Sequence, residues 1–439
     1  MKRFLFLFIY IFSYPMVYCA KLDITAENYF AIKSFSNLID KNKNYNLSYY
    51  SQNSEISFTL KTIMLEKTEN SWMDVSIGMK FFSVDNSSKV INSFYLKELS
   101  DFYQGKSSIF IPNKAYIKIH NFIKDNIIAT FGKQPYTLSH GLVLSDNGKG
   151  LDGIKLDFIN KMFFDTIETF YFRVNNSFTN INVSEDIYGL TFNKSFGDGI
   201  WQIYGISNKN YGRTPDISFY SDKNNKFFYG ISYYLDKNNI KYSCEFAVEK
   251  GHSYLNNNKI SHNAYALFTS AQWQTRLPTL GKTNTRFNYI KSSGNSASVF
   301  KENRAFYSPF SRKYNGFEKY GLGEIYKAST YDTIKTSDTL NGLPDGLSGI
   351  NAINIGIDIP YKKGILSLDY FNYQAAQSSN PNKSIFLGYE TDIKYTIKMG
   401  GKTSLYILYS IFTPKSAIIQ EFKEIESTKL FSINIQAWF

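Results

Sequence analysis

The residues that could do chemistry in this chain match no catalytic pattern. The four histidines, His120, His140, His252 and His262, are scattered, and the sequence contains no HExxH, paired CxxC or GxSxG motif. Ser139 and His140 are adjacent, but neighbouring side chains on an extended backbone point apart. We therefore predict no catalytic residues, no metal site and no cofactor.

Arginine and lysine side chains instead suit the binding of anions. Past residue 20 the chain has six arginines, and a guanidinium group can bind a carboxylate or phosphate at two points. In an extended strand Arg276 lies on the face opposite Trp273, and Arg286 lies on the face opposite Phe287, as expected for a strand with one polar face. We expect this face to contact a hydrophilic, anionic solute. The predicted set, with its acidic neighbours, is Arg173, Arg276, Arg286, Lys80, Lys118, Lys155, Lys241, Lys394, Lys398, Asp152, Asp157, Glu390 and Asp392.

The elements that carry these residues are predicted β-strands with two different faces. In residues 387–398, Leu387 and every second residue to Ile397 form a mainly apolar face, opposite four charged side chains. Unpaired charges cannot lie in a dry core, and the apolar face is too continuous for water. The same alternation recurs in residues 72–81, 240–249 and 403–412. One face should therefore meet hydrocarbon and the other water.

Length and composition favour one large β-barrel. The chain has 439 residues, 43% of them hydrophobic, yet its mean hydropathy is −0.29, and past the N-terminus no apolar run reaches 18 residues. Turn signals separate the strands, with longer connections near residues 83–112, 134–150, 176–184, 292–320 and 328–347. A soluble β-sandwich would not use so many strands. We predict an all-β fold: a single transmembrane, antiparallel, up-and-down barrel of 16–18 strands, with 18 favoured.

The N-terminus has the pattern of an export signal. Lys2 and Arg3 precede an apolar stretch over residues 4–12, and cleavage after Cys19 or Ala20 fits the small-residue rule. We predict a cleaved signal peptide over residues 1–20 and one barrel domain over residues 21–439. Cys244 would then lack an internal disulfide partner. The formal charge of +12 could suit nucleic acid, but export argues against that partner.

The C-terminal strand ends in an aromatic residue. Residues 430–439 read LFSINIQAWF, in which Phe431, Ile433, Ile435 and Phe439 share one face. This ending resembles the signal read by the bacterial barrel-assembly machinery. It predicts that machinery as a partner through Phe439, together with outer-membrane lipid.

One internal segment resembles a known family. Residues 129–158 read ATFGKQPYTLSHGLVLSDNGKGLDGIKLDF, a strand ending in Gly-Lys-Gln, a glycine-containing loop and then Asp-Gly before a new strand. This pattern is similar to alginate-export-type outer-membrane porins. The matching loop residues are Gly132, Lys133, Gln134, Gly141, Asn147, Lys149 and Gly153. The resemblance implies an 18-stranded barrel that exports or admits an anionic polysaccharide through a basic lumen.

Together these patterns predict a passive outer-membrane channel for a hydrophilic, anionic solute or oligosaccharide. The main alternative is a structural or adhesive barrel whose lumen is occluded and whose long loops bind an outside partner. An enzymatic barrel is a third alternative, with no motif in its favour.

Overall fold

The structure is a computed structural model of the full chain. It describes residues 20–38, 45–65, 71–84, 107–159, 162–176, 183–210, 223–255, 258–296, 301–308, 310–315, 318–330, 343–422 and 426–439. The predicted signal peptide, apart from Ala20, lies outside these residues. Among the described residues, no helix is long and apolar enough to span a membrane.

Almost every described element is a β-strand. The strands are β1 (Lys21–Leu38), β2 (Tyr45–Met64), β3 (Trp72–Val84), β4 (Ser108–His120), β5 (Ile127–Gln134), β6 (Leu151–Ile159), β7 (Thr166–Asn176), β8 (Val183–Phe196), β9 (Gly199–Asn210), β10 (Lys223–Lys237), β11 (Ile240–Leu255), β12 (Asn258–Leu277), β13 (Gly281–Ser292), β14 (Glu302–Asn303), β15 (Tyr314–Asn315), β16 (Glu318–Lys319), β17 (Leu347–Tyr361), β18 (Gly364–Ser378), β19 (Phe386–Lys398), β20 (Thr403–Pro414) and β21 (Thr428–Trp438). One short helix, α4 (Ser416–Glu421), precedes β21.

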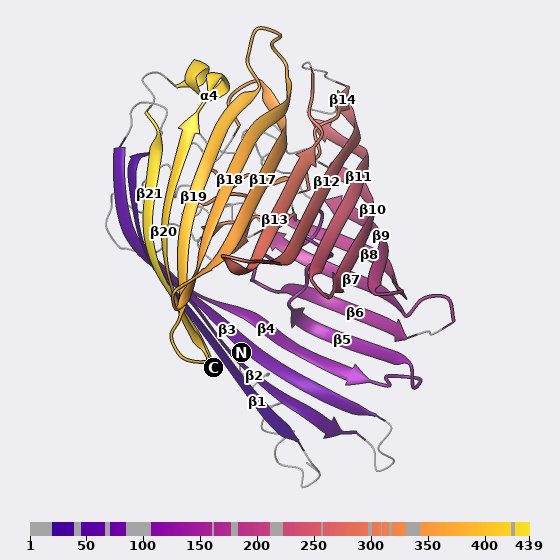
Figure 1. The fold of residues 1–439 in the computed structure, drawn as a ribbon. Helices are drawn as coiled ribbons and strands as arrows, with labels where there is room; N and C mark the ends of the chain where they lie inside the picture. Colours follow the sequence, from indigo (N-terminus) through magenta and orange to yellow (C-terminus); the bar gives the residue numbers. More distant parts are fainter. Residues whose placement is uncertain are drawn as a thin grey trace.

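Eighteen antiparallel strands close into a barrel (Figure 1). The described sheet has 19 strands, but the two-residue β14 only pairs beside β12 and is not part of the wall. Closure comes from the first and last strands, which pair in register with Phe30 opposite Ile435. Phe439 extends this ladder, because its N–H donates to the Ala26 carbonyl at 2.8 Å. The predicted all-β, single-barrel fold with 18 strands is confirmed.

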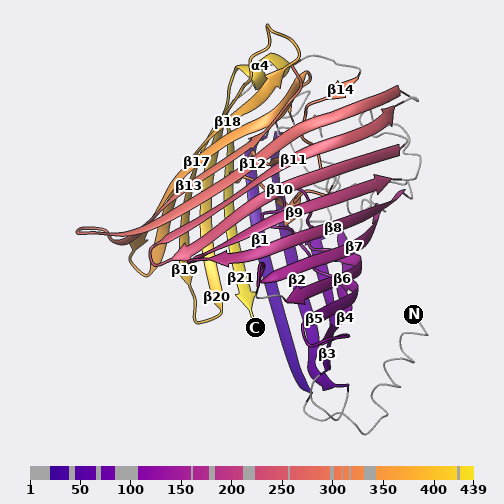
Figure 2. The ribbon, with the colours of Figure 1, turned by 90° about the vertical axis from the view of Figure 1, so that its right-hand side faces the viewer.

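The two ends of the barrel differ in the length of their connections. At one end every turn is seven residues or shorter, and Asn238, with φ 53°, permits the tight reversal between β10 and β11. At the other end the connections include residues 85–107, 135–150 and 293–346. Figure 2 shows α4 and β14 at this loop end, with the C-terminus at the opposite, turn end. Outer-membrane barrels place long loops outside the cell and short turns in the periplasm.

The outward side chains of the strands are mainly apolar, as the alternation predicts. Ile353, Ile355 and Ile407 are examples of large apolar residues left between about two- and three-fifths exposed on the outer wall. Leu387 is the exception, and the prediction that it faces lipid is wrong. The β18–β19 register shifts between Tyr373 and Gln374, so a β-bulge turns Leu387 inward, where it is fully buried.

The packed core lies inside the barrel, between the wall and two loops that fold inward from the loop end. The first is the β5–β6 loop (residues 135–150), whose Leu138, Leu142 and Leu144 are buried against wall side chains of β7 to β10. The second is the connection between β13 and β17, whose Ile325 and Tyr326 pack against β18 and β20. Each buried leucine contributes roughly 1.5–3 kcal/mol, which favours the folded-in position of these loops.

Candidate functional site: the barrel interior

The interior wall carries ion pairs on neighbouring strands. Glu55 contacts Lys80 at 3.1 Å and Lys114 at 2.6 Å. Lys155 lies 2.9 Å from an oxygen of Asp157 and 3.1 Å from Glu168. Such pairs keep buried charge compensated, because a lone ion in this environment would be costly.

Arg286 is held between two carboxylates. It pairs with Asp358 on β17 and lies 2.7 Å from Asp369 on β18. Asn354 donates to Asp369 at 3.2 Å, and Ser367 donates to Asp358 at 2.6 Å. Arg286 therefore lies on the inner side of the wall, where its guanidinium group already pairs with two wall carboxylates.

Glu390 on β19 anchors the second inward loop to the wall. Its side chain is completely buried and accepts hydrogen bonds from the backbone N–H groups of Glu324 at 2.6 Å, Ile325 at 2.7 Å and Tyr326 at 3.0 Å. Tyr373 also donates to it at 3.1 Å. A carboxylate that accepts several N–H groups forms strong, charge-assisted bonds. Glu390 is therefore bonded to the loop in this structure.

Two further glutamates on β11 anchor the inward loops in the same way. Glu245 accepts from the His140 backbone N–H at 2.8 Å and from the Tyr204 hydroxyl at 2.6 Å. Glu249 accepts from the Tyr307 backbone N–H at 2.8 Å and pairs with Lys226 at 2.7 Å. Both carboxylates are fully buried. We call Glu245, Glu249 and Glu390 the anchor glutamates.

The two inward loops also bind each other. The Ser145 N–H donates to the Phe310 carbonyl at 2.8 Å, and the Arg312 N–H donates to the Gly141 carbonyl at 2.8 Å. Asn147 accepts from the Lys313 N–H at 2.6 Å. The loops therefore form one unit that fills part of the loop-end half of the barrel.

Five interior cations have no carboxylate partner among the described residues: Lys118, Arg276, Lys282, Lys394 and Lys398. All five lie in the turn-end half of their strands. Arg276 and Lys282 are directly opposite each other in the β12–β13 ladder. Like charges in this position repel, so this pair suits a wet surface that attracts anions.

A polar hollow lies next to this cationic surface. Its volume is about 300 Å³, and it is lined by Lys241, Gln272, Gln274, Lys282 and Asn284, among others. Lys241 pairs with Asp236 at 2.8 Å, whereas the ammonium group of Lys282 is free of such a partner among the described residues. The hollow could hold a small hydrophilic solute near the periplasmic mouth.

The structure places most of the predicted solute-contacting residues on the inner side of the wall. These are Lys80, Lys118, Lys155, Asp157, Lys241, Arg276, Arg286, Glu390, Asp392, Lys394 and Lys398. Their distribution is uneven: Glu390 and Asp392 are buried near the second loop, while Arg276 and Lys398 are exposed near the turns. Contact with a solute stays a prediction for each of them.

Arg173 and Asp152 are corrections, because both point away from the lumen. On β7 the inward side chains are Phe170 and Phe172, so the next residue, Arg173, lies on the outer wall. It pairs there with Asp186 at 3.0 Å. Asp152 has the same parity as outward Ile154 and pairs with Lys133 at 3.0 Å. Charge type alone suggested a luminal role, whereas strand parity decides the face.

The residues of the predicted family motif surround the first inward loop. Gly132 has φ 110°, and a Cβ there would lie 2.4 Å from the Ala115 carbonyl oxygen, so only glycine permits this approach of β4 and β5. Gln134 is buried, and Gly141 and Asn147 bond the second loop. Burial lowers the pKa of Lys149 well below its ordinary value. Gly153 lies against Phe172.

His140 should make the first inward loop sensitive to acid. Burial, and secondarily the charge of Arg312, lower the pKa of His140 to about 4, below the ordinary value of 6.5. Between these two pH values an undocked loop binds a proton that the docked loop does not. Docking should therefore weaken as the pH falls from about 6.5 to about 4. Single-channel recordings should show larger or noisier conductance over this range.

Two variants separate this effect from other acid effects. His140→Phe keeps a ring against Phe268, which lies 4.6 Å away between ring centroids, and should abolish the response. His252→Phe, at a histidine packed against Tyr254, should leave it unchanged. An unaltered acid response in His140→Phe would show that another group is responsible.

Sequence reasoning missed the anchoring role of the glutamates. Glu245 and Glu249 share the polar face of β11 with Lys241, and nothing in that alternation distinguishes a loop anchor from a solvated charge. The available signal was in the loops: Leu142-Val143-Leu144 and Ile325-Tyr326 are apolar runs that an exposed loop would not favour. Among the described residues, no group of three or more His, Cys, Asp or Glu side chains could hold a metal ion.

The closed wall, its apolar outer belt and its inward loops define an outer-membrane β-barrel with a porin fold. No protein-family model matches the chain, and no curated protein matches its sequence. Solved structures match the fold of the chain. OpdK of Pseudomonas aeruginosa with vanillate has 7% identity and a TM-score of 0.54, and the match covers 95% of this chain and 98% of that one.

Two further porins agree. A BenF-like porin from Pseudomonas fluorescens has 9% identity and a TM-score of 0.57, covering 95% of this chain and 98% of its own. OccAB1 of Acinetobacter baumannii has 9% identity and a TM-score of 0.58, with 95% and 96% covered. These likenesses show a shared fold, and with the apolar belt they indicate the bacterial outer membrane. They do not support the alginate-export resemblance in particular.

Proposed function

We propose that the chain forms a passive outer-membrane channel that prefers hydrophilic anions. The observation that carries this proposal is an excess of positive charge in the turn-end half of the interior. There Lys118, Arg276, Lys282, Lys394 and Lys398 have no carboxylate partner among the described residues, whereas Glu27 is the one described carboxylate on the inner wall of that half that has no cationic partner. Cations lining an aqueous passage select anions through their field.

The porin fold supports passage of a solute, and one neighbour supports its charge. The P. aeruginosa OpdK structure contains vanillate, which is a carboxylate. The segment over residues 129–158 suggests a larger anion, an oligosaccharide of the alginate type. We therefore propose small carboxylates and short oligouronates as the solute class.

One observation favours the alternative of an occluded, adhesive barrel. The inward loops fill part of the loop-end half, and the anchor glutamates hold them there. A flux assay separates the two functions. Liposomes containing the protein should admit vanillate and oligomannuronate faster than a neutral sugar of similar size. Folded protein that admits none of these solutes would contradict the channel and favour the adhesive barrel.

Arg276 and Lys282, which lie opposite each other and have no carboxylate partner among the described residues, should set much of this preference for anions. Replacing both with glutamine removes two positive charges beside the polar hollow without breaking a described ion pair. We expect the flux ratio of vanillate to neutral sugar to fall by about threefold to tenfold, since each of the two cations contributes on the order of 0.3–0.7 kcal/mol in a wet site. Lys362→Gln, in the β17–β18 turn, is the matched control. An unchanged ratio in the double variant would show that these residues do not select the solute.

A further inference from the structure

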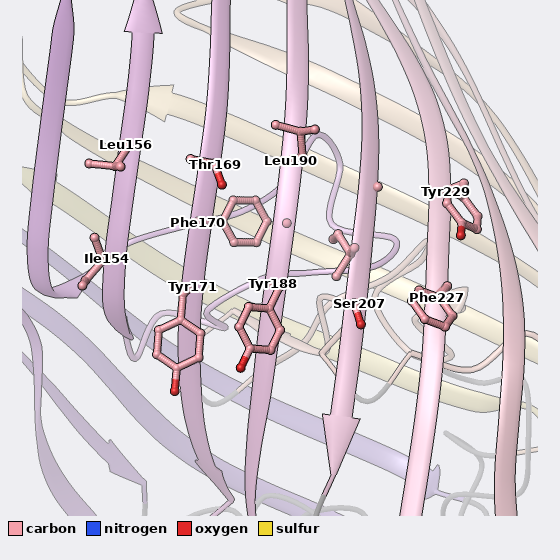
Figure 3. A pocket seen from close by; sticks show the side chains of 13 residues that line it. Ile154, Leu156, Thr169, Phe170, Tyr171, Tyr188, Leu190, Ser207, Phe227 and Tyr229 are labelled. Atoms are coloured by element: carbon pink, nitrogen blue, oxygen red, sulfur yellow. The ribbon is translucent and has the colours of Figure 1, made fainter.

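The outer wall carries a groove that faces the lipid. It has a volume of about 520 Å³ and spans β6 to β10, with Leu156, Tyr171, Tyr188, Leu190 and Tyr229 among its lining residues. Figure 3 shows Tyr171 and Tyr188 side by side at one edge, and their ring centroids are 5.1 Å apart. The lining is mainly apolar, as a hydrocarbon chain would require.

The groove exists because small residues interrupt the apolar wall. At Gly205 an added Cβ would contact only the Tyr229 ring, at 3.8 and 3.9 Å, so the site has room for a side chain that the sequence omits. Ser207 on the same strand, and Thr169 beyond Leu190 on β7, also line the groove and are small. Neither space nor backbone angle requires glycine at position 205. The missing side chain therefore leaves a depression on a surface that is otherwise continuous.

A charged row lies directly beyond the groove toward the loop end. Outward Arg173 follows Tyr171 on β7, outward Asp186 precedes Tyr188 on β8, and Lys209 follows Ser207 on β9. The Arg173 Nε lies 3.0 Å from an Asp186 oxygen, to which Tyr171 also donates at 3.0 Å. Lys209 lies 6.0 Å from the Tyr188 ring centroid.

The accessible charge of this row is positive. The Arg173 side chain is 57% exposed, whereas that of Asp186 is 12% exposed beneath it. Lys209 has no carboxylate partner among the described residues. On the next strands, Asp152 and Lys133 cancel each other as a pair. Cations on a lipid-facing wall are costly unless an anionic headgroup meets them.

We propose that this surface binds a phosphorylated glycolipid of the outer leaflet, with the chemistry of lipid A. Its phosphate would contact Arg173 and Lys209, and one of its acyl chains would lie in the groove across Gly205. The order of the two parts fits that leaflet, since the charged row is nearer the loop end than the groove is. The proposal does not depend on whether the barrel conducts.

Lipid retention measured by native mass spectrometry tests the proposal. Purified, delipidated barrel is titrated with diphosphorylated lipid A, dephosphorylated lipid A and phosphatidylethanolamine. We expect the diphosphorylated form to bind at least about tenfold more tightly than the other two. The double variant Arg173→Gln, Lys209→Gln should lose about tenfold of this affinity, and Gly205→Leu should weaken every acylated ligand by filling the groove.

Matched variants make the test specific. Lys291→Gln removes an outer-wall cation beside Tyr265, 5.9 Å from its ring centroid, and should bind lipid A normally. Gly205→Ala adds one methyl group and should weaken binding less than Gly205→Leu. Heat-modifiable mobility in gels confirms that each variant is folded. Equal affinity for the three lipids, or wild-type affinity in the folded double variant, would overturn the proposal.

Discussion

Glu390→Gln should release the second inward loop and raise the single-channel conductance. The substitution replaces a carboxylate that accepts three backbone N–H groups, from residues 324–326, with an uncharged amide. The amide oxygen can still accept from residues 324 and 325, but the NH₂ group cannot accept from the Tyr326 N–H. Charge-assisted bonds of this kind are worth roughly 1.5–3 kcal/mol each, and the variant should lose about 3–5 kcal/mol of docking free energy. The docking equilibrium then shifts by a factor of about 10² to 5 × 10³ toward the released loop.

A matched variant distinguishes loop release from a change in luminal charge. Glu27→Gln removes the same charge from the inner wall near the turn end, where Gln436, at 2.8 Å, is its one side-chain donor among the residues that the structure describes. It should leave the conductance close to that of the wild type. If Glu390→Gln and Glu27→Gln have the same conductance, the anchor glutamates do not control the loops.

Arg286→Ala should be the most destabilising single substitution in the turn-end half of the barrel. Removing the guanidinium group leaves Asp358 and Asp369 on adjacent strands, with no cation between them. These side chains are largely but not fully buried, and breaking such an ion pair from one side costs up to about 3–5 kcal/mol, because the remaining charge loses its partner. Urea unfolding of the refolded barrel in vesicles should show this loss of unfolding free energy.

The control removes an arginine from a pair that is open to solvent. Arg304 lies 2.9 Å from Glu302, and its side chain is 62% exposed, so Arg304→Ala should change the unfolding free energy by less than about 1 kcal/mol. Arg286→Lys should recover part of the loss. A similar small effect of Arg286→Ala would mean that the two aspartates do not need this cation.

The fold could be predicted from the sequence because the alternation of polar and apolar residues can be seen within a single strand, and it also determines which side of the barrel wall each residue faces. A polar side chain such as Asp74 or Lys394, followed by an apolar one that faces lipid, repeats along β3, β11, β19 and β20. Chain length and the hairpin rhythm predict 16–18 strands, and the resemblance over residues 129–158 implies the 18 that the structure has. The inward orientation of Leu387 could not be predicted from the sequence, because a β-bulge depends on pairing with the neighbouring strand.

The interior chemistry was only partly predictable, since partners come from distant residues. Arg276 and Arg286 both show the parity of an inner face, but only the folded chain brings Asp358 and Asp369 to Arg286. In the sequence Glu390 has the pattern of a solvated charge, and only the folded chain brings the backbone N–H groups of residues 324–326 to its carboxylate. The prediction for Arg173 is wrong because it rests on residue type, whereas Arg173 lies two residues from outward Tyr171 and so faces the same way.

The zero-current potential across a planar bilayer tests the central claim most directly. Purified wild-type protein is inserted between two potassium chloride solutions of unequal concentration, and the potential at zero current is recorded. Lys118, Lys394 and Lys398 have no carboxylate partner in the described part of the chain and should make chloride the more permeant ion, so the sign of the potential should be that of an anion-selective pore. A cation-selective sign, or folded barrel that never conducts, would contradict this account.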